Sequence, residues 1–137
     1  MWPRCDLSGP RCNPLQSTRV EIYKEFKFEA AHRLINVPPT HKCARLHGHS
    51  YRVRVYLEGP LDPQTGWVMD FADLKQVCKP LIDQLDHSYL NDIEGLEQST
   101  AERIAIWFWD RLKPSLPLLA RIEVRETSTS GAIYRGV

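Results

Sequence analysis

The sequence predicts an α+β domain in which two helices cover one face of an antiparallel four-stranded sheet. Two long segments near the start of the chain alternate polar and apolar residues, which is typical of strands with one buried face. Two segments in the middle repeat apolar residues at helical spacing, and two shorter alternating segments close the chain. The expected order is therefore strand, strand, helix, helix, strand, strand.

The first expected strand runs from Arg19 to His32, and the second from His47 to about Glu58. Because side chains two residues apart share a face of a strand, His32 closes the apolar face of the first strand. By the same alternation, His47 and His49 open the apolar face of the second strand. If the two strands pair as antiparallel neighbours, the end of the first lies beside the start of the second.

The first expected helix follows Asp70, a residue type that favours the N-cap position. Pro80 lies inside the helical pattern and should kink or shorten the helix. The second helix is expected to start at Ser99, which forms a capping-box pattern with Glu102, and to stop at Pro114. The apolar positions of the first helix are Phe71, Leu74, Val77, Cys78, Leu81, Ile82 and Leu85.

Shorter elements complete the chain. A loop is expected from Asp86 to Gln98, between the two helices, and a short extended piece from Trp67 to Met69. The third strand is expected at about Ala120 to Thr127, and a short last strand at Ala132 to Arg135.

A length of 137 residues suits a single domain. Residues 1–18 contain several prolines and little periodic pattern, which predicts a flexible N-terminal extension. Residues 19–137 are expected to form the domain itself. A net charge of +1 gives no basic excess for nucleic acid, and no apolar run approaches the roughly 20 residues of a membrane span.

The four cysteines form no CxxC pair, which predicts reduced thiols in a cytoplasmic protein. Cys78 lies on the apolar face of the first helix and is expected in the core. A disulfide or a metal clip between Cys5 and Cys12 is a less favoured alternative, since disulfides are rare in the cytosol.

Three histidines are the strongest functional signal. If the first two strands pair as expected, His32, His47 and His49 converge, and the connecting loop brings Cys43 over them. Neutral imidazole is a common zinc ligand, and three protein ligands with an open fourth position are typical of a catalytic zinc. The alternative is that the histidines are hydrogen-bonded residues at a strand end, without a metal.

Other residues could also carry chemistry. Glu126 continues the face of Ile122 and Val124, where a carboxylate would need a partner, such as a flat ligand rich in N–H groups. The alternative is that the third strand ends there and Glu126 reaches water.

Asp86 and His87 could act as a proton relay, or could form a polar helix exit, where a histidine suits the negative end of the helix dipole. Cys43 beside a bound metal would have a lowered pKa and act as a thiolate base, or could be an ordinary loop thiol.

Four motifs together resemble the 6-pyruvoyl-tetrahydropterin synthase family, over about Arg19 to Val137. Within that family, the spacing of three residues between Cys43 and His47 resembles that of the branch that forms 6-carboxy-5,6,7,8-tetrahydropterin in queuosine biosynthesis. The motifs are Phe28 to Leu34, Cys43 to His49, Leu85 to Asn91, and Arg125 to Thr127.

The resemblance implies a tunnelling fold, in which subunits join their sheets into a barrel, usually as a homohexamer built from two trimers. It implies that zinc binds to the three histidines. It also implies that Cys43 is the catalytic base and that Asp86 and His87 relay protons.

The resemblance further implies a pterin substrate, with Glu126 and Thr127 holding the pterin ring. Thr100 and Glu102 match the segment that helps to form the pterin pocket of the neighbouring subunit. Ala101, between them, stands where the family usually has a hydroxyl residue.

The implied reaction converts 7,8-dihydroneopterin triphosphate into 6-carboxy-5,6,7,8-tetrahydropterin, with release of triphosphate and acetaldehyde. One alternative is the family's other activity, which makes 6-pyruvoyl tetrahydropterin and retains the three-carbon side chain. A second alternative is a non-catalytic, zinc-stabilised binding domain in which Cys43 is the fourth ligand.

Overall fold

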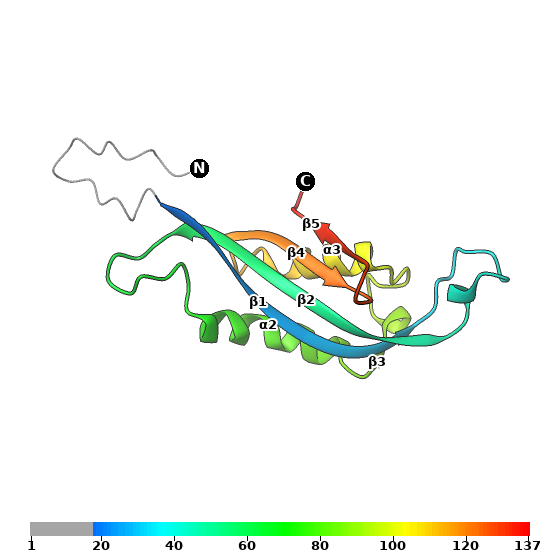
Figure 1. The fold of residues 1–137 in the computed structure, drawn as a ribbon. Coiled ribbons are helices and arrows are strands. Elements are labelled where there is room, and N and C mark those ends of the chain that lie inside the picture. Colours follow the sequence, from blue (N-terminus) through cyan, green and yellow to red (C-terminus); the bar gives the residue numbers. More distant parts are fainter. Residues whose placement is uncertain (1–17) are drawn as a thin grey trace.

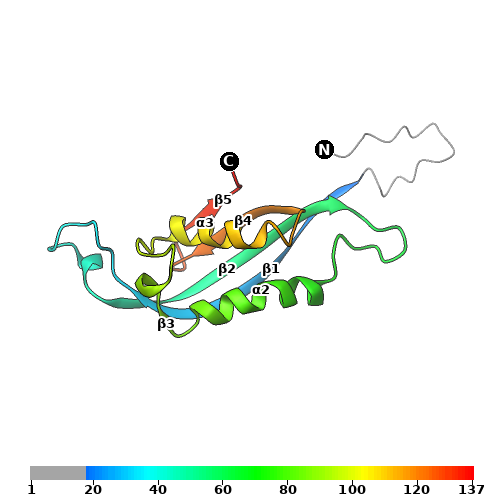
Figure 2. The ribbon, with the colours of Figure 1, turned by 180° about the vertical axis from the view of Figure 1, so that it is seen from behind.

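Both helices lie on one face of a five-stranded sheet in the computed structural model, which describes residues 18–137 (Figure 1). Seen from behind, α2 and α3 lie in front of the sheet (Figure 2). The strand order across the sheet is β3-β1-β2-β4-β5. The elements in chain order are β1 (Arg19–His32), η1 (Lys42–Ala44), β2 (His47–Pro60), α2 (Phe71–Leu85), β3 (Ser88–Tyr89), η2 (Leu90–Asp92), α3 (Ala101–Leu112), β4 (Leu119–Arg125) and β5 (Gly131–Tyr134).

The α+β class and the two helices are confirmed, but the prediction of a purely antiparallel sheet of four strands is wrong. The additional strand β3 lies within the segment expected to be a loop and pairs with β1 in the parallel direction. The order is therefore strand, strand, helix, strand, helix, strand, strand. A strand of two residues is too short for alternation to reveal it, and its position depends on the chain passing the edge of β1 after α2.

The first two strands form a long antiparallel ribbon that pairs without a break from Arg19 opposite Pro60 to His32 opposite His47. The alternation that predicted the strands sets this register, because a slip of one residue would move every apolar side chain to the other face. The loop between the two strands projects beyond the end of the sheet (Figure 1).

The core lies between the sheet and the helices. The helix α2 packs on β1, and α3 packs on β4 and β5. Phe28 and Tyr51, from adjacent strands, stack with ring centroids 4.9 Å apart beneath α3. Each large apolar side chain buried here contributes about 1.5–3 kcal/mol. Further members of the core are Val53, Val55, Leu74, Cys78, Leu85, Ile104, Phe108, Ile122 and Val124.

The helix α2 begins after Asp70, as predicted, and the Asp70 carboxylate accepts a hydrogen bond from the backbone of Ala72. Of the two effects expected of Pro80, a kink or a shorter helix, shortening does not occur, since α2 continues to Leu85. Buried residues before and after the proline hold both halves of the helix against the core. Cys78 is fully buried, as expected, and burial raises the pKa of its thiol to about 12.

The N-cap of the second helix, α3, lies one residue later than predicted. Thr100, not Ser99, is the N-cap, and its hydroxyl accepts a hydrogen bond from the backbone of Arg103. The predicted capping box of Ser99 and Glu102 is therefore wrong. Both residues are good caps by type, and the burial of Ser99 against the end of β1 decides between them.

The remaining boundaries differ slightly from the predictions. The strand β4 ends at Arg125, two residues before the expected end, and residues 67–69 form no strand. Cys5, Cys12 and nearly all of the expected extension lie outside the described residues. No helix within residues 18–137 is long and apolar enough to cross a membrane.

Candidate metal centre

Three histidines converge where β1 ends and β2 begins. His32 is the last residue of β1 and pairs with His47, and Ala30 pairs with His49. The imidazole centroids lie 4.6 Å apart for His32 and His47, 5.2 Å for His32 and His49, and 4.9 Å for His47 and His49. The antiparallel pairing thus brings together three side chains that are separated by up to 17 positions in the sequence.

Backbone carbonyls orient two of the rings. The Nδ1 atom of His32 lies 2.8 Å from the carbonyl oxygen of Ser99, and Nδ1 of His47 lies 2.7 Å from that of Arg45. Because a carbonyl oxygen only accepts hydrogen bonds, each Nδ1 carries the proton and each Nε2 retains a lone pair. Metal-binding histidines are commonly held in this way by a partner on the other ring nitrogen.

The Nε2 atoms of His32 and His49 are buried, and neither has a hydrogen-bond partner within residues 18–137. A buried acceptor without a partner costs about 1–3 kcal/mol. Burial lowers the pKa of both imidazoles, against the opposing effect of the nearby Glu126 charge. Neutral imidazoles suit a bound cation, and Nε2 of His32 offers it an unpaired lone pair.

Glu126 completes the group, although it lies one residue beyond the end of β4. Its Oε1 atom is 2.9 Å from Nε2 of His49 and 3.8 Å from Nε2 of His32, and its side chain is only 26% exposed. The ligand atoms of these three residues and of His47 all lie within 4.8 Å of one another. The strand β4 therefore ends before Glu126, as one of the two hypotheses from the sequence expected, but the Glu126 carboxylate faces the histidines.

A set of three histidines and one carboxylate fits a divalent metal such as zinc, which takes four nitrogen, oxygen or sulfur ligands. The four residues could hold such an ion without rearrangement of the strands. The choice of metal depends on donor type and geometry, and imidazole with carboxylate is a common zinc environment.

A hollow of about 420 Å³ adjoins the metal centre. Glu126 and Thr127 line it, so the carboxylate faces both the histidines and the hollow. This volume lies within the range of small-molecule pockets. The other residues that line the hollow are Ser50, Arg52, Arg125 and Ser128.

The model of the 6-pyruvoyl tetrahydropterin synthase family matches residues 21–137. The chain belongs to this family. It is 50% identical over 121 residues to the 6-carboxy-5,6,7,8-tetrahydropterin synthase of Synechocystis, covering 82% of this chain and 91% of that protein. It is 36% identical over 144 residues to human 6-pyruvoyl tetrahydrobiopterin synthase, covering 93% of this chain and 95% of that protein.

Solved structures agree with this assignment. The 6-pyruvoyl tetrahydropterin synthase of Caenorhabditis elegans superposes with a TM-score of 0.81 at 31% identity, covering 88% of this chain and 97% of that structure. The family resemblance of the four motifs is therefore confirmed.

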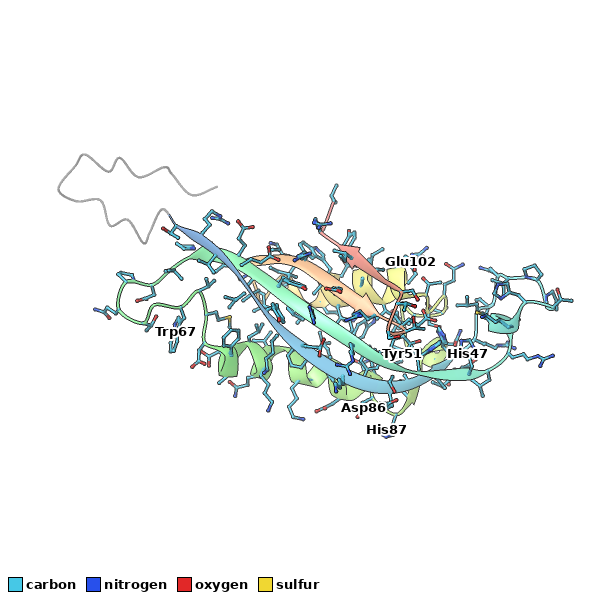
Figure 3. The ribbon with its side chains drawn as sticks, viewed as in Figure 1. His47, Tyr51, Trp67, Asp86, His87 and Glu102 are labelled. Atoms are coloured by element: carbon cyan, nitrogen blue, oxygen red, sulfur yellow. The ribbon has the colours of Figure 1, made fainter. Side chains whose placement is uncertain are left out.

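The residues expected to move protons lie outside the metal-ligand group. Cys43 lies in η1 and is a partly buried free thiol. The Nδ1 atom of His87 is 3.1 Å from Oδ1 of Asp86, so the two adjacent side chains do contact each other. The same Oδ1 atom accepts a hydrogen bond from the backbone of Glu29, which lowers the pKa of Asp86. Figure 3 shows Asp86 and His87 apart from His47, on the other side of β1.

A shallow hollow of about 550 Å³ nevertheless includes both His49 and His87 in its lining, together with Glu29 and Ser50. Thr100 uses its hydroxyl to cap α3, and Glu102 is exposed in the first turn of the same helix.

Sequence reasoning missed three residues that support the histidines. Ser99 holds His32 through its carbonyl, and the hydroxyl of Tyr51 lies 3.3 Å from Nδ1 of His32. Figure 3 shows Tyr51 near His47, and burial raises the pKa of the Tyr51 phenol. The third residue, Asn91, binds the backbone that follows His32. The position of Asn91 within a family motif was the only signal for these roles.

Asn91 ties three segments together. Its side chain accepts a hydrogen bond from the backbone N–H of Arg33 at 3.0 Å and donates to the Arg33 carbonyl at 2.8 Å. It also donates to the carbonyl of Glu97 at 3.0 Å, and the Ser99 hydroxyl lies 3.4 Å from its Oδ1 atom. Asn91 thus fixes the chain on both sides of the His32–Ser99 contact.

Proposed function

We propose that this chain is a zinc-dependent 6-carboxy-5,6,7,8-tetrahydropterin synthase that acts in queuosine biosynthesis. Its substrate would be 7,8-dihydroneopterin triphosphate, and its products the carboxylated tetrahydropterin, triphosphate and acetaldehyde. The observation that carries the proposal is the 50% identity to the Synechocystis enzyme of that name, over 91% of its length. The three residues between Cys43 and His47 also favour this branch.

The proposed reaction needs no external reductant. The pterin ring gains two electrons, while the side-chain carbon next to it is oxidised to a carboxylate. The two outer carbons leave as acetaldehyde, the phosphate chain leaves as triphosphate, and water supplies the remaining carboxylate oxygen. A catalyst for this reaction must therefore orient the side-chain hydroxyls and move protons between carbon and oxygen atoms.

His32, His47 and His49 would hold the zinc. When bound, zinc would act as a Lewis acid that lowers the pKa of the side-chain hydroxyls. The carboxylate of Glu126 would accept the N–H groups along one edge of the pterin ring, and Thr127 would add a contact within the 420 Å³ hollow. Thr100 and Glu102 would contribute to the pterin pocket of a neighbouring subunit.

Cys43 would remove and return protons at the side-chain carbons. Asp86 and His87 would relay protons, and the contact of their side chains supports a shared proton. Asp86 stays ionised at neutral pH, because the backbone N–H of Glu29 stabilises its charged form.

The second candidate is 6-pyruvoyl tetrahydropterin synthase, which the 36% identity to the human enzyme favours. The two activities differ in one bond, since the pyruvoyl product retains all three side-chain carbons. The third candidate, a non-catalytic domain with Cys43 as a zinc ligand, is disfavoured. Within residues 18–137, the group that could hold a metal contains Glu126 and not Cys43.

The deciding experiment supplies 7,8-dihydroneopterin triphosphate to the zinc-loaded full chain and measures acetaldehyde together with the pterin product. Acetaldehyde that disappears in Cys43→Ala, with the zinc content unchanged, is the expected result. Release of triphosphate without acetaldehyde would assign the pyruvoyl activity instead. Absence of turnover by the zinc-loaded protein would overturn both enzymatic candidates.

A homohexamer and a cytoplasmic location are further parts of the proposal. Cys43 and Cys78 form no disulfide within residues 18–137, as is usual for cytoplasmic proteins. Light scattering coupled to size-exclusion chromatography measures the assembly, and a mass near six times 15.9 kDa is expected.

A further inference from the structure

Glu126 makes a contact that hydrogen bonding does not explain. Its Oε1 atom lies 2.9 Å from Nε2 of His49, but that nitrogen has no hydrogen-bond partner within the described part of the chain. The nearby Nε2 of His32 also lacks a partner there, and its Nδ1 already carries the ring proton. The Nε2 lone pair of His32 and the Glu126 carboxylate are therefore acceptors that face each other across 3.8 Å, with Nε2 of His49 beside them, and a cation shared by the three groups would satisfy them all.

We infer that Glu126 is the fourth ligand of the metal when no substrate is bound, and that a bound pterin ring draws this carboxylate away. The inference rests on the proposed function, in which the same carboxylate binds the ring. Pterin binding would then open the coordination position that the side-chain hydroxyls occupy.

The position of Glu126 suits such an exchange. The residue follows the last residue of β4, in a turn closed by the hydrogen bond from its backbone N–H to the Ser130 carbonyl. Its backbone is therefore held in place, while its long side chain can rotate. That side chain faces the histidines and also lines the 420 Å³ hollow, so one carboxylate has two competing partners.

The exchange has a measurable consequence for affinity. By reciprocal linkage, a ligand that removes Glu126 from the metal must weaken metal binding, and the metal must weaken binding of that ligand by the same factor. This holds for pterin itself, which has the ring but no side-chain hydroxyls to replace the carboxylate. A substrate with hydroxyls would compensate for the lost ligand, which favours pterins that carry the correct side chain.

The test uses the full chain and two isosteric variants. Glu126→Gln should weaken zinc binding by at least about ten-fold, measured by competition with a chelator, since even outer-shell partners contribute about 10–100-fold. Glu123→Gln is the matched control, because Glu123 lies on β4 and accepts a hydrogen bond from the Tyr56 hydroxyl, away from the metal. Its zinc affinity should equal that of the wild type.

Glu126→Asp separates ligation from general charge attraction. The shorter side chain retains the charge but loses reach, so its zinc affinity should fall nearly as far as that of Glu126→Gln. Full affinity in Glu126→Asp, or in Glu126→Gln, would overturn the inference. Thermal unfolding of each metal-free variant confirms that it folds. A Gln amide can donate to the histidine lone pairs, so the metal-free Glu126→Gln variant should melt no lower than the wild type.

A second measurement uses cobalt in place of zinc. Addition of pterin should change the visible absorption spectrum of the cobalt-loaded wild type and should weaken its cobalt affinity. An unchanged spectrum at pterin concentrations that saturate the protein would overturn the inference. Neither measurement requires turnover, so failure of the proposed reaction and failure of this inference are distinguishable.

Discussion

Asn91→Ala tests whether the hydrogen bonds from the Asn91 side chain to the segment after His32 support the metal centre. The substitution removes three hydrogen bonds to backbone groups at 2.8–3.0 Å. At about 0.5–1.5 kcal/mol each, and with the lower values expected at a half-buried site, the loss is about 2 kcal/mol. In a domain of this size, such a loss lowers the melting temperature by roughly 6–10 °C.

The same substitution should weaken zinc binding by about ten-fold, because the Ser99 carbonyl that orients His32 loses its anchor. Circular dichroism of the metal-free protein measures the first effect, and chelator competition measures the second. Asn91→Asp retains the acceptor for Arg33 but places a carboxylate oxygen against the carbonyl oxygens of Arg33 and Glu97, so it should destabilise the protein at least as much as Asn91→Ala.

Asn36→Ala is the control, since Asn36 is exposed in the loop that follows β1 and makes no side-chain hydrogen bond within residues 18–137. An unchanged melting temperature in Asn91→Ala would refute the stability contribution assigned to the Asn91 hydrogen bonds. A lower melting temperature with wild-type zinc affinity would refute their link to the metal centre.

Three further predictions concern the same region. His49→Asn should reduce zinc affinity by more than the roughly 10–100-fold loss expected for an outer-shell partner. His41→Asn is the control, because His41 lies outside the ligand group and its loss should leave zinc affinity unchanged. Equal zinc affinities of the two variants would contradict the ligand assignment. Folding lowers the pKa values of His32 and His49, so below about pH 6.5 the unfolded chain binds more protons than the folded protein. The metal-free protein should therefore lose stability as the pH falls from about 7 to about 5.5, and its stability should change little above about pH 7. A melting temperature that is constant from pH 7 to pH 5.5 would contradict this. Gly131→Ala should lower both melting temperature and zinc affinity, because a Cβ there would collide with the Val124 carbonyl and shift the turn that carries Glu126. Gly66→Ala is the control, since a Cβ there meets nothing within 4 Å, and it should affect the melting temperature but not the zinc affinity. A wild-type zinc affinity in Gly131→Ala would show that the turn does not position the Glu126 carboxylate.

The sequence by itself determined the two long strands, the two helices and the placement of His32, His47 and His49 on the apolar faces at the strand ends. Alternation between apolar and polar residues encodes which face of each strand is buried. The convergence of the histidines also required antiparallel pairing of β1 with β2, which the prediction assumed and the structure shows.

Only the tertiary structure decided the surroundings of the histidines. The strand β3, the cap at Thr100 and the partners Ser99 and Asn91 all depend on segments far from β1 in the sequence. Every residue has a backbone carbonyl, so residue type does not mark the carbonyl that will orient an imidazole. Glu126 shows the same limit, because its approach to His49 depends on where β4 ends against β2, and that is fixed by packing of the sheet on α3.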